Sequence, residues 1–234
     1  MSLVPGAVNF RDIGGLPAGR ARTRSGVLYR SGNLAGVDEL GAAAFRELGV
    51  RRVIDLRSDE EVAHAPSRLP DVETLRVPLF LGSVTSFFLE DVSLAQMYSA
   101  LLERSGDRLV TAIRGILGAQ PVVLHCTVGK DRTGVTIALA LAAVGVDEDA
   151  VVEDYALTEQ NLPSWRGDRT LARIRAAFPD AQHLEELATK SPAAVMRDLL
   201  RQVRAEHGSV AGFLRAHGMS DEEISELRRV LVEE

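Results

Sequence analysis

The sequence is poor in several residue types, and each scarcity limits what the protein can be. Its 234 residues include one cysteine, and only two of its 27 basic residues are lysines, Lys130 and Lys190. A single cysteine excludes an internal disulfide and a zinc site built on cysteines. It leaves two interpretations of Cys126, an inert buried thiol or a nucleophile. Because arginine is so common here, one arginine is weak evidence of a site, and Lys130 is stronger evidence.

Long apolar runs and basic stretches are also missing. No apolar run reaches the roughly 18 residues of a membrane span, and a formal net charge of −6 argues against a general nucleic-acid binder. No signal-peptide pattern opens the chain, so we expect a cytoplasmic protein, with export by a signal-independent route left open. Hydrophobic residues make up 46% of the sequence and no repeat or low-complexity linker divides it. We therefore expect one domain over residues 1–234.

Branched apolar runs alternate with helical patterns along the chain. The runs predict strands at 27–30, 50–56, 75–80 and 121–125. Apolar spacing of three and four residues predicts helices over 38–48, 93–104, 107–117 and 132–144, and the pattern is helical from Asp147 onward. Ser220 and Glu223 predict a capping box at the start of the last helix. Strands interleaved with helices indicate an α/β fold.

The most informative stretch is His125–Gly134, at the junction of an apolar strand and an apolar helix. The N–H groups of such a loop and the helix N-terminus converge on one point, which favours an anion. The same dipoles would stabilise a thiolate at Cys126. Arg132 would close the loop and bind two oxygens of a phosphoryl group. Gly129 permits tight backbone curvature, and the hydroxyl of Thr133 could donate a hydrogen bond to the sulfur.

This loop resembles the Cys-x5-Arg signature of the protein tyrosine phosphatase superfamily. In detail it is similar to the His-Cys-x-x-Gly-Lys-Asp-Arg-Thr-Gly loop of atypical bacterial tyrosine and dual-specificity (lipid-type) phosphatases, a group with mycobacterial members. The resemblance implies a mostly parallel twisted sheet of four to five strands flanked by helices, with a helical C-terminal half. It covers nearly the whole chain, because five further stretches also match: Asn9–Gly15, Leu28–Gly32, Val53–Glu61, Asp154–Thr158 and Gly208–Leu231.

The resemblance implies a cysteine-dependent phosphatase. Its substrate would be phosphotyrosine, with phosphoserine, phosphothreonine or phosphoinositides as further candidates, and inorganic phosphate would be a product. Cys126 would attack phosphorus to give a phosphocysteine, and Arg132 would hold the phosphoryl oxygens. No cofactor or metal is implied, and the five histidines lack ligand spacing. His125 would orient the loop from behind. We assign substrate binding to Thr127, Val128, Gly129, Lys130, Thr133 and Arg57.

Two of these binding residues have plainer alternatives. In the resembling family, lysine at the position of Lys130 accompanies acceptance of phosphoinositides, but a solvent-facing lysine is the alternative. Arg57 could reach the substrate or form a surface ion pair. Arg11 and Asp12 would pair with each other or brace the loop, and Arg30 and Ser31 would be scaffold residues.

The leaving group needs a proton, so a general acid is expected. The Trp-Pro-Asp loop of many tyrosine phosphatases is not recognisable, since arginine and glycine follow Trp165. Asp131 is the strongest candidate because the loop places it beside any bound phosphate. Its alternative role is a salt bridge to Arg132 or another arginine. Further candidates for the acid are Asp55, Asp59 and Asp91.

Aromatic residues outside the loop suggest a wall for a ring-shaped substrate: Phe80, Phe87, Phe88 and Tyr98. A core role is an equal alternative for Phe80 and Tyr98. Adjacent phenylalanines in an exposed loop are unusual, so we expect Phe87 and Phe88 to form a mobile lid.

Other functions fit the loop less well. An ATP-binding Walker loop would need glycine at Leu124 and serine or threonine at Asp131. Rhodanese-type sulfur transfer also uses a lone cysteine, but those loops lack the Lys-Asp-Arg-Thr-Gly ending. A non-catalytic phosphate-binding relative usually loses Cys126 or Arg132, and both are intact here.

Overall fold

A twisted sheet forms the centre of the fold. Within the residues that the computed structural model describes (3–67, 69, 72–79, 89–162, 172 and 175–233), this sheet has five strands in the order β1-β4-β7-β5-β6. All neighbours are parallel except β1 and β4. The strands are β1 (Arg11–Asp12), β4 (Leu28–Ser31), β5 (Arg52–Asp55), β6 (Glu73–Arg76) and β7 (Val122–His125). The predicted mostly parallel α/β sheet is confirmed.

The register of the three central strands brings their carboxyl ends to one edge. Ser31 and Asp55, the last residues of β4 and β5, both pair with His125, the last residue of β7. Ligand sites of parallel sheets lie at this edge, where the loops leave the strands. The loop that follows His125 is therefore at the position where an α/β sheet binds ligands.

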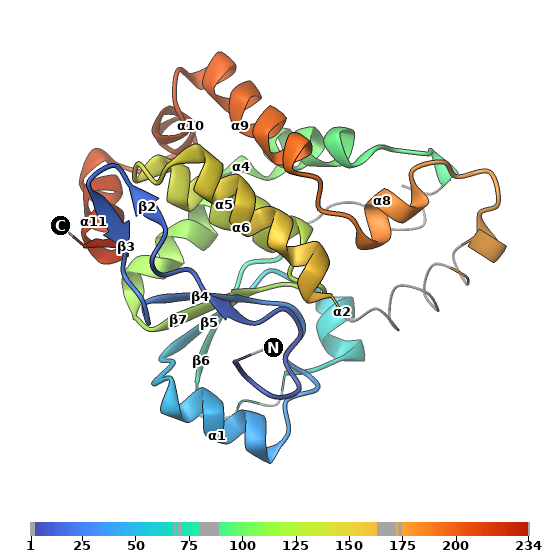
Figure 1. The fold of residues 1–234 in the computed structure, drawn as a ribbon, viewed down its shortest axis with the longest axis horizontal. Coiled ribbons are helices and arrows are strands. Elements are labelled where there is room, and N and C mark those ends of the chain that lie inside the picture. Colours follow the sequence, from blue (N-terminus) through green and yellow to red (C-terminus); the bar gives the residue numbers. More distant parts are fainter. Residues whose placement is uncertain are drawn as a thin grey trace.

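Side chains of the sheet alternate between two hydrophobic clusters, as the period of a strand requires. Val122 and Leu124 enter the larger cluster, whereas Val123 enters the smaller one. The smaller cluster lies against α1 (Glu39–Glu47), which covers one face of the sheet in Figure 1. Helices cover the other face: α4 (Leu94–Gly118), α5 (Asp131–Ala143), α6 (Glu148–Asn161), α9 (Ala193–His207), α10 (Val210–Ala216) and α11 (Asp221–Leu231).

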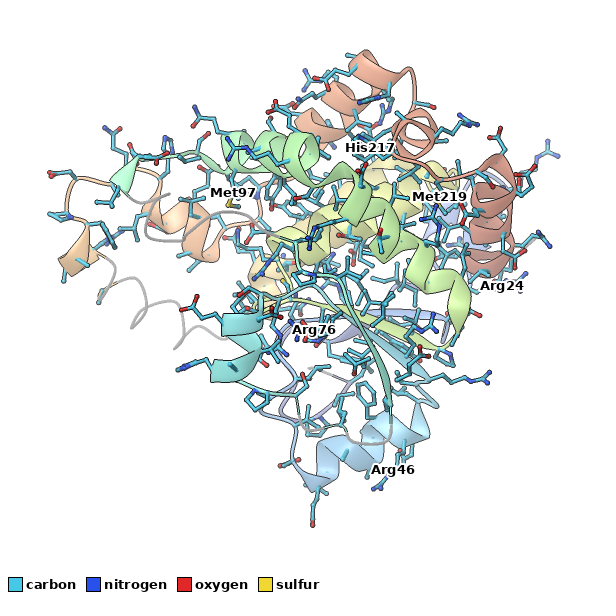
Figure 2. The ribbon with its side chains drawn as sticks, turned by 180° about the vertical axis from the view of Figure 1, so that it is seen from behind. Arg24, Arg46, Arg76, Met97, His217 and Met219 are labelled. Atoms are coloured by element: carbon cyan, nitrogen blue, oxygen red, sulfur yellow. The ribbon has the colours of Figure 1, made fainter. Side chains whose placement is uncertain are left out.

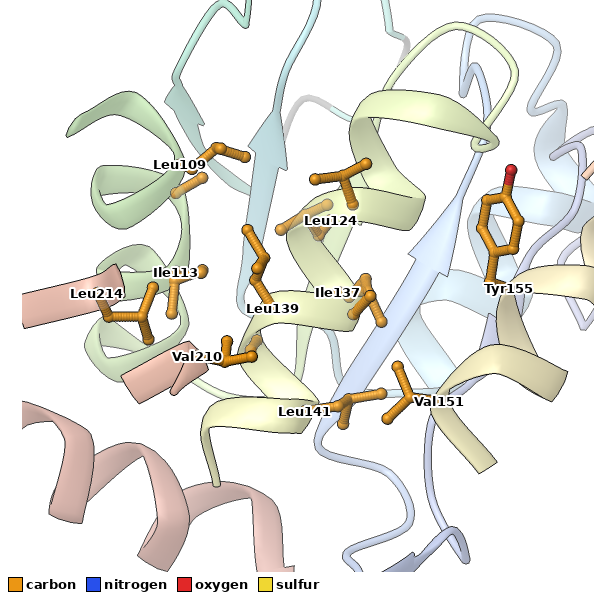
Figure 3. Close-up of a cluster of buried hydrophobic side chains, with 14 of the residues drawn as sticks. Leu109, Ile113, Leu124, Ile137, Leu139, Leu141, Val151, Tyr155, Val210 and Leu214 are labelled. Carbon is orange, nitrogen blue, oxygen red and sulfur yellow. The ribbon is translucent and has the colours of Figure 1, made fainter. Parts of the chain in front are cut away.

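Helix α5 runs through the middle of the larger cluster. Every residue from Thr133 to Leu141 is buried, because α4, α6 and α10 all contact this helix. Figure 3 shows Ile137, Leu139 and Leu141 among side chains from those neighbours. The loop that precedes α5 is consequently attached to a helix that is held on several sides by close packing.

The described helices and strands agree with most of the predicted ones. The helices predicted at 93–104 and 107–117 are one helix, α4, with a kink at Ser105 (φ −131°). Next to the kink, a Cβ on Gly106 would overlap the ring of His217, which Figure 2 labels. Helix α8 (Leu184–Thr189) lies within the stretch predicted to be helical. Other short elements escaped prediction: α2 (Asp59–His64) and a small antiparallel sheet of β2 (Pro17–Ala18), β3 (Ala21–Thr23) and β8 (Val232–Glu233). The last of these corrects the expectation of helix throughout the C-terminal half.

Candidate active site

The phosphate loop, defined here as Cys126–Arg132, curls around its own sulfur. The Gly129 N–H donates a hydrogen bond to Cys126 Sγ at 3.2 Å. Gly129 has φ +75°, and a Cβ there would lie 2.6 Å from Ser31 O and from Gly32 N. Backbone conformation and space both demand glycine at this position. The end of β4 thus packs directly against the loop, and Cys126 is only 3% exposed.

Arg132 is held in place by a carboxylate that the sequence analysis did not single out. Its Nη1 donates to Glu61 Oε2 at 2.6 Å and its Nη2 to Glu61 Oε1 at 2.7 Å. Thr127 Oγ1 donates to the same carboxylate. Glu61 also accepts the Ser58 N–H at 2.8 Å, which completes a capping box at the start of α2. The Ser-x-x-Glu spacing is the sequence signal that could have indicated this residue.

The charges of this group stabilise one another. Burial favours neutral Glu61, but the hydrogen bonds and the charge of Arg132 outweigh it and lower the pKa of Glu61 to about 2. Burial also disfavours charge on Arg132, yet Glu61 and the neighbouring Cys126 sulfur raise the pKa of that guanidinium. A fixed cation therefore lies close to the sulfur, and the two groups together could bind and stabilise an anion.

A second group of charges braces the loop from behind. The Gly129 carbonyl accepts hydrogen bonds from Asn9 Nδ2 at 3.0 Å and from Arg30 Nη2 at 2.9 Å. Arg30 also pairs with Asp154 of α6, and Arg11 Nε donates to the same carboxylate at 2.8 Å. Burial opposes ionisation of Asp154, but the two arginines lower its pKa. These residues fix the position of the glycine that donates to the sulfur.

This arrangement corrects one prediction and confirms two. Arg11 and Asp12 do not pair with each other: Arg11 binds Asp154, whereas Asp12 accepts the N–H groups of Gly14 and Gly26. The alternative, that Arg11 braces the loop, is confirmed through Asn9, whose side chain accepts from Arg11 and donates to the loop. Arg30 is a scaffold residue as expected, and Ser31 donates to the Val8 carbonyl in the same layer.

Arg57 lies in a buried ion pair, so the expectations of substrate contact or a surface pair are wrong. The side chain is 1% exposed, and its Nε and Nη2 bind the two oxygens of Asp55 at 2.9 and 2.8 Å. Its remaining donors reach Asn33, Ala65 and Ser67. With its donors engaged, Arg57 organises the chain after β5 and has none left for a substrate.

The same pair removes Asp55 from the candidates for the general acid. Burial favours its neutral form, but hydrogen bonds from Arg57 lower the pKa of Asp55. Asp59 is 93% exposed and pairs with Arg76, which Figure 2 labels beside α2. Asp91 accepts the N–H groups of Gln182 and His183. None of the three offers a carboxyl in contact with the phosphate loop.

Asp131 is inside the loop, and its Oδ1 accepts hydrogen bonds from Lys130 Nζ at 2.6 Å and from Tyr98 OH at 2.9 Å. Its salt bridge is therefore to a lysine, and the alternative role, a salt bridge to an arginine, is wrong. Lys130 is 1% exposed, so the solvent-facing alternative for this lysine is also wrong. Tyr98 is a core residue with its hydroxyl at the site.

The predictions for three further residues in and beside the loop have mixed outcomes. The buried hydroxyl of Thr133 has no hydrogen-bond partner among the described residues, so the expected bond to the sulfur is not formed here. His125 lies behind the loop as expected, with Nδ1 3.2 Å from the Cys126 carbonyl. Burial lowers the pKa of His125 to about 4, which keeps the ring neutral at pH 7. The backbone of Val128 packs closely against Gly32, because a Cβ on Gly32 would lie 2.7 Å from the Val128 carbonyl oxygen.

Some expectations fall on parts of the chain that the structure does not cover. Phe80, Phe87, Phe88 and Trp165 lie outside the described residues, so the lid stays a prediction. Among the described residues, no group of three or more histidine, cysteine or acidic side chains could hold a metal ion. The described helices include none long and apolar enough to cross a membrane.

Comparison with known proteins shows the family of the chain. A model of the tyrosine phosphatase family matches residues 3–233, so the chain belongs to that family, and its enzyme class is protein-tyrosine phosphatase. It is 33% identical to the triple specificity protein phosphatase PtpB of Mycobacterium tuberculosis, with 98% of each chain covered. It is 32% identical to a putative tyrosine-protein phosphatase of Cupriavidus necator, covering 88% of this chain and 80% of that protein.

A solved structure is also similar. The crystal structure of P. aeruginosa TpbA shares 21% identity with a TM-score of 0.39, covering 72% of this chain and 89% of TpbA.

Proposed function

We propose that the protein hydrolyses phosphotyrosine through a phosphocysteine intermediate formed on Cys126. The observation that carries the proposal is the phosphate loop itself, in which the sulfur accepts a loop N–H and adjoins a charged guanidinium. The family supplies the reaction class, and this geometry supplies the residues. A loop whose N–H groups point inward stabilises a thiolate, and it also stabilises the phosphoryl oxygens of a bound substrate.

The reaction has two steps. The sulfur of Cys126 attacks phosphorus while the bond from phosphorus to the leaving oxygen breaks, and Asp131 gives its proton to that oxygen. Water then attacks the phosphocysteine, Asp131 takes back a proton, and inorganic phosphate leaves with the thiolate restored. Arg132 and the loop N–H groups from Thr127 to Lys130 hold the phosphoryl oxygens in both steps.

Substrate range is the finer part of the proposal. The PtpB relative is described as a triple specificity phosphatase, which supports activity on phosphoserine, phosphothreonine or phosphoinositides beside phosphotyrosine. Lys130 supports acceptance of a multiply charged head group, because it is a buried positive charge within the loop. We propose one catalytic domain over residues 1–234, working in the cytoplasm.

The test is turnover of an aryl phosphate by the wild-type protein, Cys126→Ser and Arg132→Lys. We expect both variants to lose about 1000-fold or more in kcat/KM, because one lacks the nucleophile and the other the two-pronged phosphate contact. Activity of Cys126→Ser close to wild type would refute the proposal. A panel of phosphotyrosine, phosphoserine and phosphothreonine peptides beside phosphoinositides then ranks the substrates. Phosphate binding without turnover by the wild type would favour the non-catalytic alternative.

A further inference from the structure

A chain of hydroxyl groups leads from the helical layer to Asp131. Tyr98 OH donates to Asp131 Oδ1 at 2.9 Å, and the hydroxyls of Tyr98 and Tyr155 are 2.8 Å apart. A phenol has one proton, and Tyr98 gives its own to the carboxylate. Tyr155 must therefore donate to Tyr98. The direction of the chain is fixed, and each bond polarises the next one.

Three helices meet to build this chain. Tyr98 comes from α4, Tyr155 from α6, and Asp131 is the first residue of α5. The two rings pack edge to face with centroids 6.2 Å apart. Gly134 of α5 makes room for them, because a Cβ there would lie 2.9 Å from Tyr155 Cδ2. The glycine that ends the family's loop signature thus lets Tyr155 approach the site.

The two phenols are permanent donors. Burial, together with the negative charge of Asp131, raises the pKa of Tyr98 well above its ordinary value. Burial and the same carboxylate also raise the pKa of Tyr155. Neither hydroxyl ionises at any pH at which the enzyme works, so the bond to Asp131 keeps one polarity throughout the reaction.

The partners of Asp131 lie on one side of its carboxyl group. Oδ1 accepts both Tyr98 and Lys130, whereas Oδ2 receives no hydrogen bond from the residues that the structure describes. A carboxyl group held by one oxygen presents the other in a fixed direction. The proton for the leaving group would then sit on Oδ2, at a defined place relative to the phosphate loop.

We propose that Tyr98 is a positioning residue that orients Asp131 for proton transfer to the leaving group, with Tyr155 supporting it from behind. This inference rests on the proposed function of Asp131. Tyr98 touches no reacting atom, so its loss should not weaken phosphate capture. It should slow the reaction only to the extent that bond cleavage needs the proton.

Leaving-group dependence tests the role. Tyr98→Phe keeps the ring and removes the hydroxyl, and single-turnover rates are measured on 4-nitrophenyl phosphate and on phenyl phosphate. Nitrophenolate is a good leaving group that needs little protonation, so we expect Tyr98→Phe to lower the rate on 4-nitrophenyl phosphate about twofold. Phenolate is a poorer leaving group, so we expect the rate on phenyl phosphate to fall about tenfold. Tyr155→Phe should show the same pattern with smaller losses in rate. Tyr29→Phe is the matched control, a buried tyrosine of β4 in the smaller hydrophobic cluster, and should leave both rates unchanged.

A double variant separates positioning from a structural role. If Tyr98 acts through Asp131, Tyr98→Phe in an Asp131→Asn background should cost no further activity on phenyl phosphate. Equal losses on both substrates, or losses that multiply in the double variant, would overturn the inference while the phosphatase proposal stands. Absence of turnover by the wild-type protein on either substrate would instead defeat the proposed function first. Should Tyr98→Phe not fold, Tyr155→Phe carries the same comparison.

Discussion

Two carboxylates neutralise arginines around the phosphate loop, and their surroundings differ. Asp154 lies behind the loop, where its 6% exposed side chain pairs with Arg11 and with Arg30. Glu61 lies beside Arg132, and its side chain is 32% exposed. Asp154 and Arg30 are closed to solvent, and Arg30 touches the loop through the Gly129 carbonyl, whereas the Glu61 carboxylate is within reach of water.

This difference in exposure suggests different roles for the two carboxylates. A buried charge has no water to replace a lost partner. The rear group, which consists of Arg11, Arg30 and Asp154, must therefore stay paired for the loop to keep its shape. The pair of Glu61 and Arg132 is partly hydrated, and an arriving phosphoryl group can share its guanidinium at little cost. We therefore propose that Asp154 acts mainly on stability, whereas Glu61 sets the orientation in which Arg132 meets the substrate.

The largest effect is expected at the rear group. Asp154→Ala leaves the fully buried guanidinium of Arg30 and the partly buried one of Arg11 without their carboxylate, and should lower the free energy of unfolding by about 3–5 kcal/mol. Urea unfolding at pH 7 measures it. The control is Asp149→Ala on the same helix, whose 83% exposed side chain pairs with Arg197 and should change stability by about 0.5 kcal/mol or less. Equal losses in the two variants would erase the contrast between buried and exposed pairs.

The next effect tests the contact between the rear group and the loop. Gly129→Ala combines a positive φ with overlap onto Ser31 and Gly32, and we expect a loss of about 3 kcal/mol in stability together with most phosphatase activity. Gly208→Ala is the matched control, since Gly208 has φ +74° with no atom within 4 Å of the added Cβ. It should cost about 1 kcal/mol and leave activity intact. An active Gly129→Ala enzyme would show that the loop does not need this shape.

A smaller effect with a distinctive pH dependence is expected at Glu61. Its pKa falls from 4.5 to about 2 on folding, so its contribution is complete above pH 4.5 and is lost as the pH falls toward 2. Discounted for solvent exposure, the contribution is about 2 kcal/mol. Glu61→Gln should lose this amount at pH 7 and match the wild-type protein near pH 2. Glu60→Gln, an exposed neighbour, should show no such trend, and a Glu61→Gln deficit that persists at pH 2 would contradict the assignment.

Sequence could predict the phosphate loop because its signal is local. The strand, Cys126, Gly129 and the following helix are contiguous, and dipoles and backbone curvature act over a few residues. The charges that hold the loop are not local: Glu61 and Arg132 are 71 positions apart, and Arg30 and Asp154 are 124 apart. Only the register of the sheet and the packing of α6 bring them together.

The wrong predictions have the same physical cause, because they also depend on contacts between distant parts of the chain. With 25 arginines in the chain, no pattern tells a buried Arg57 from a surface one, because its partners follow from the path of the chain after β5. The role of Tyr98 depends on how α4 crosses α5, which periodicity does not specify. Strands of two or three residues such as β1 and β2 are too short to show a period at all.

The central claim is that the sulfur of Cys126 carries the phosphoryl group during turnover. Its most direct measurement is a rapid acid quench of the wild-type protein reacting with an aryl phosphate, followed by mass spectrometry of the peptide that contains Cys126. We predict a phosphoryl group on this cysteine within the first turnover, and none in Cys126→Ser treated in the same way. Rapid turnover with the phosphoryl group on another residue, or with no protein-bound phosphoryl group under conditions that preserve phosphocysteine, would contradict the account.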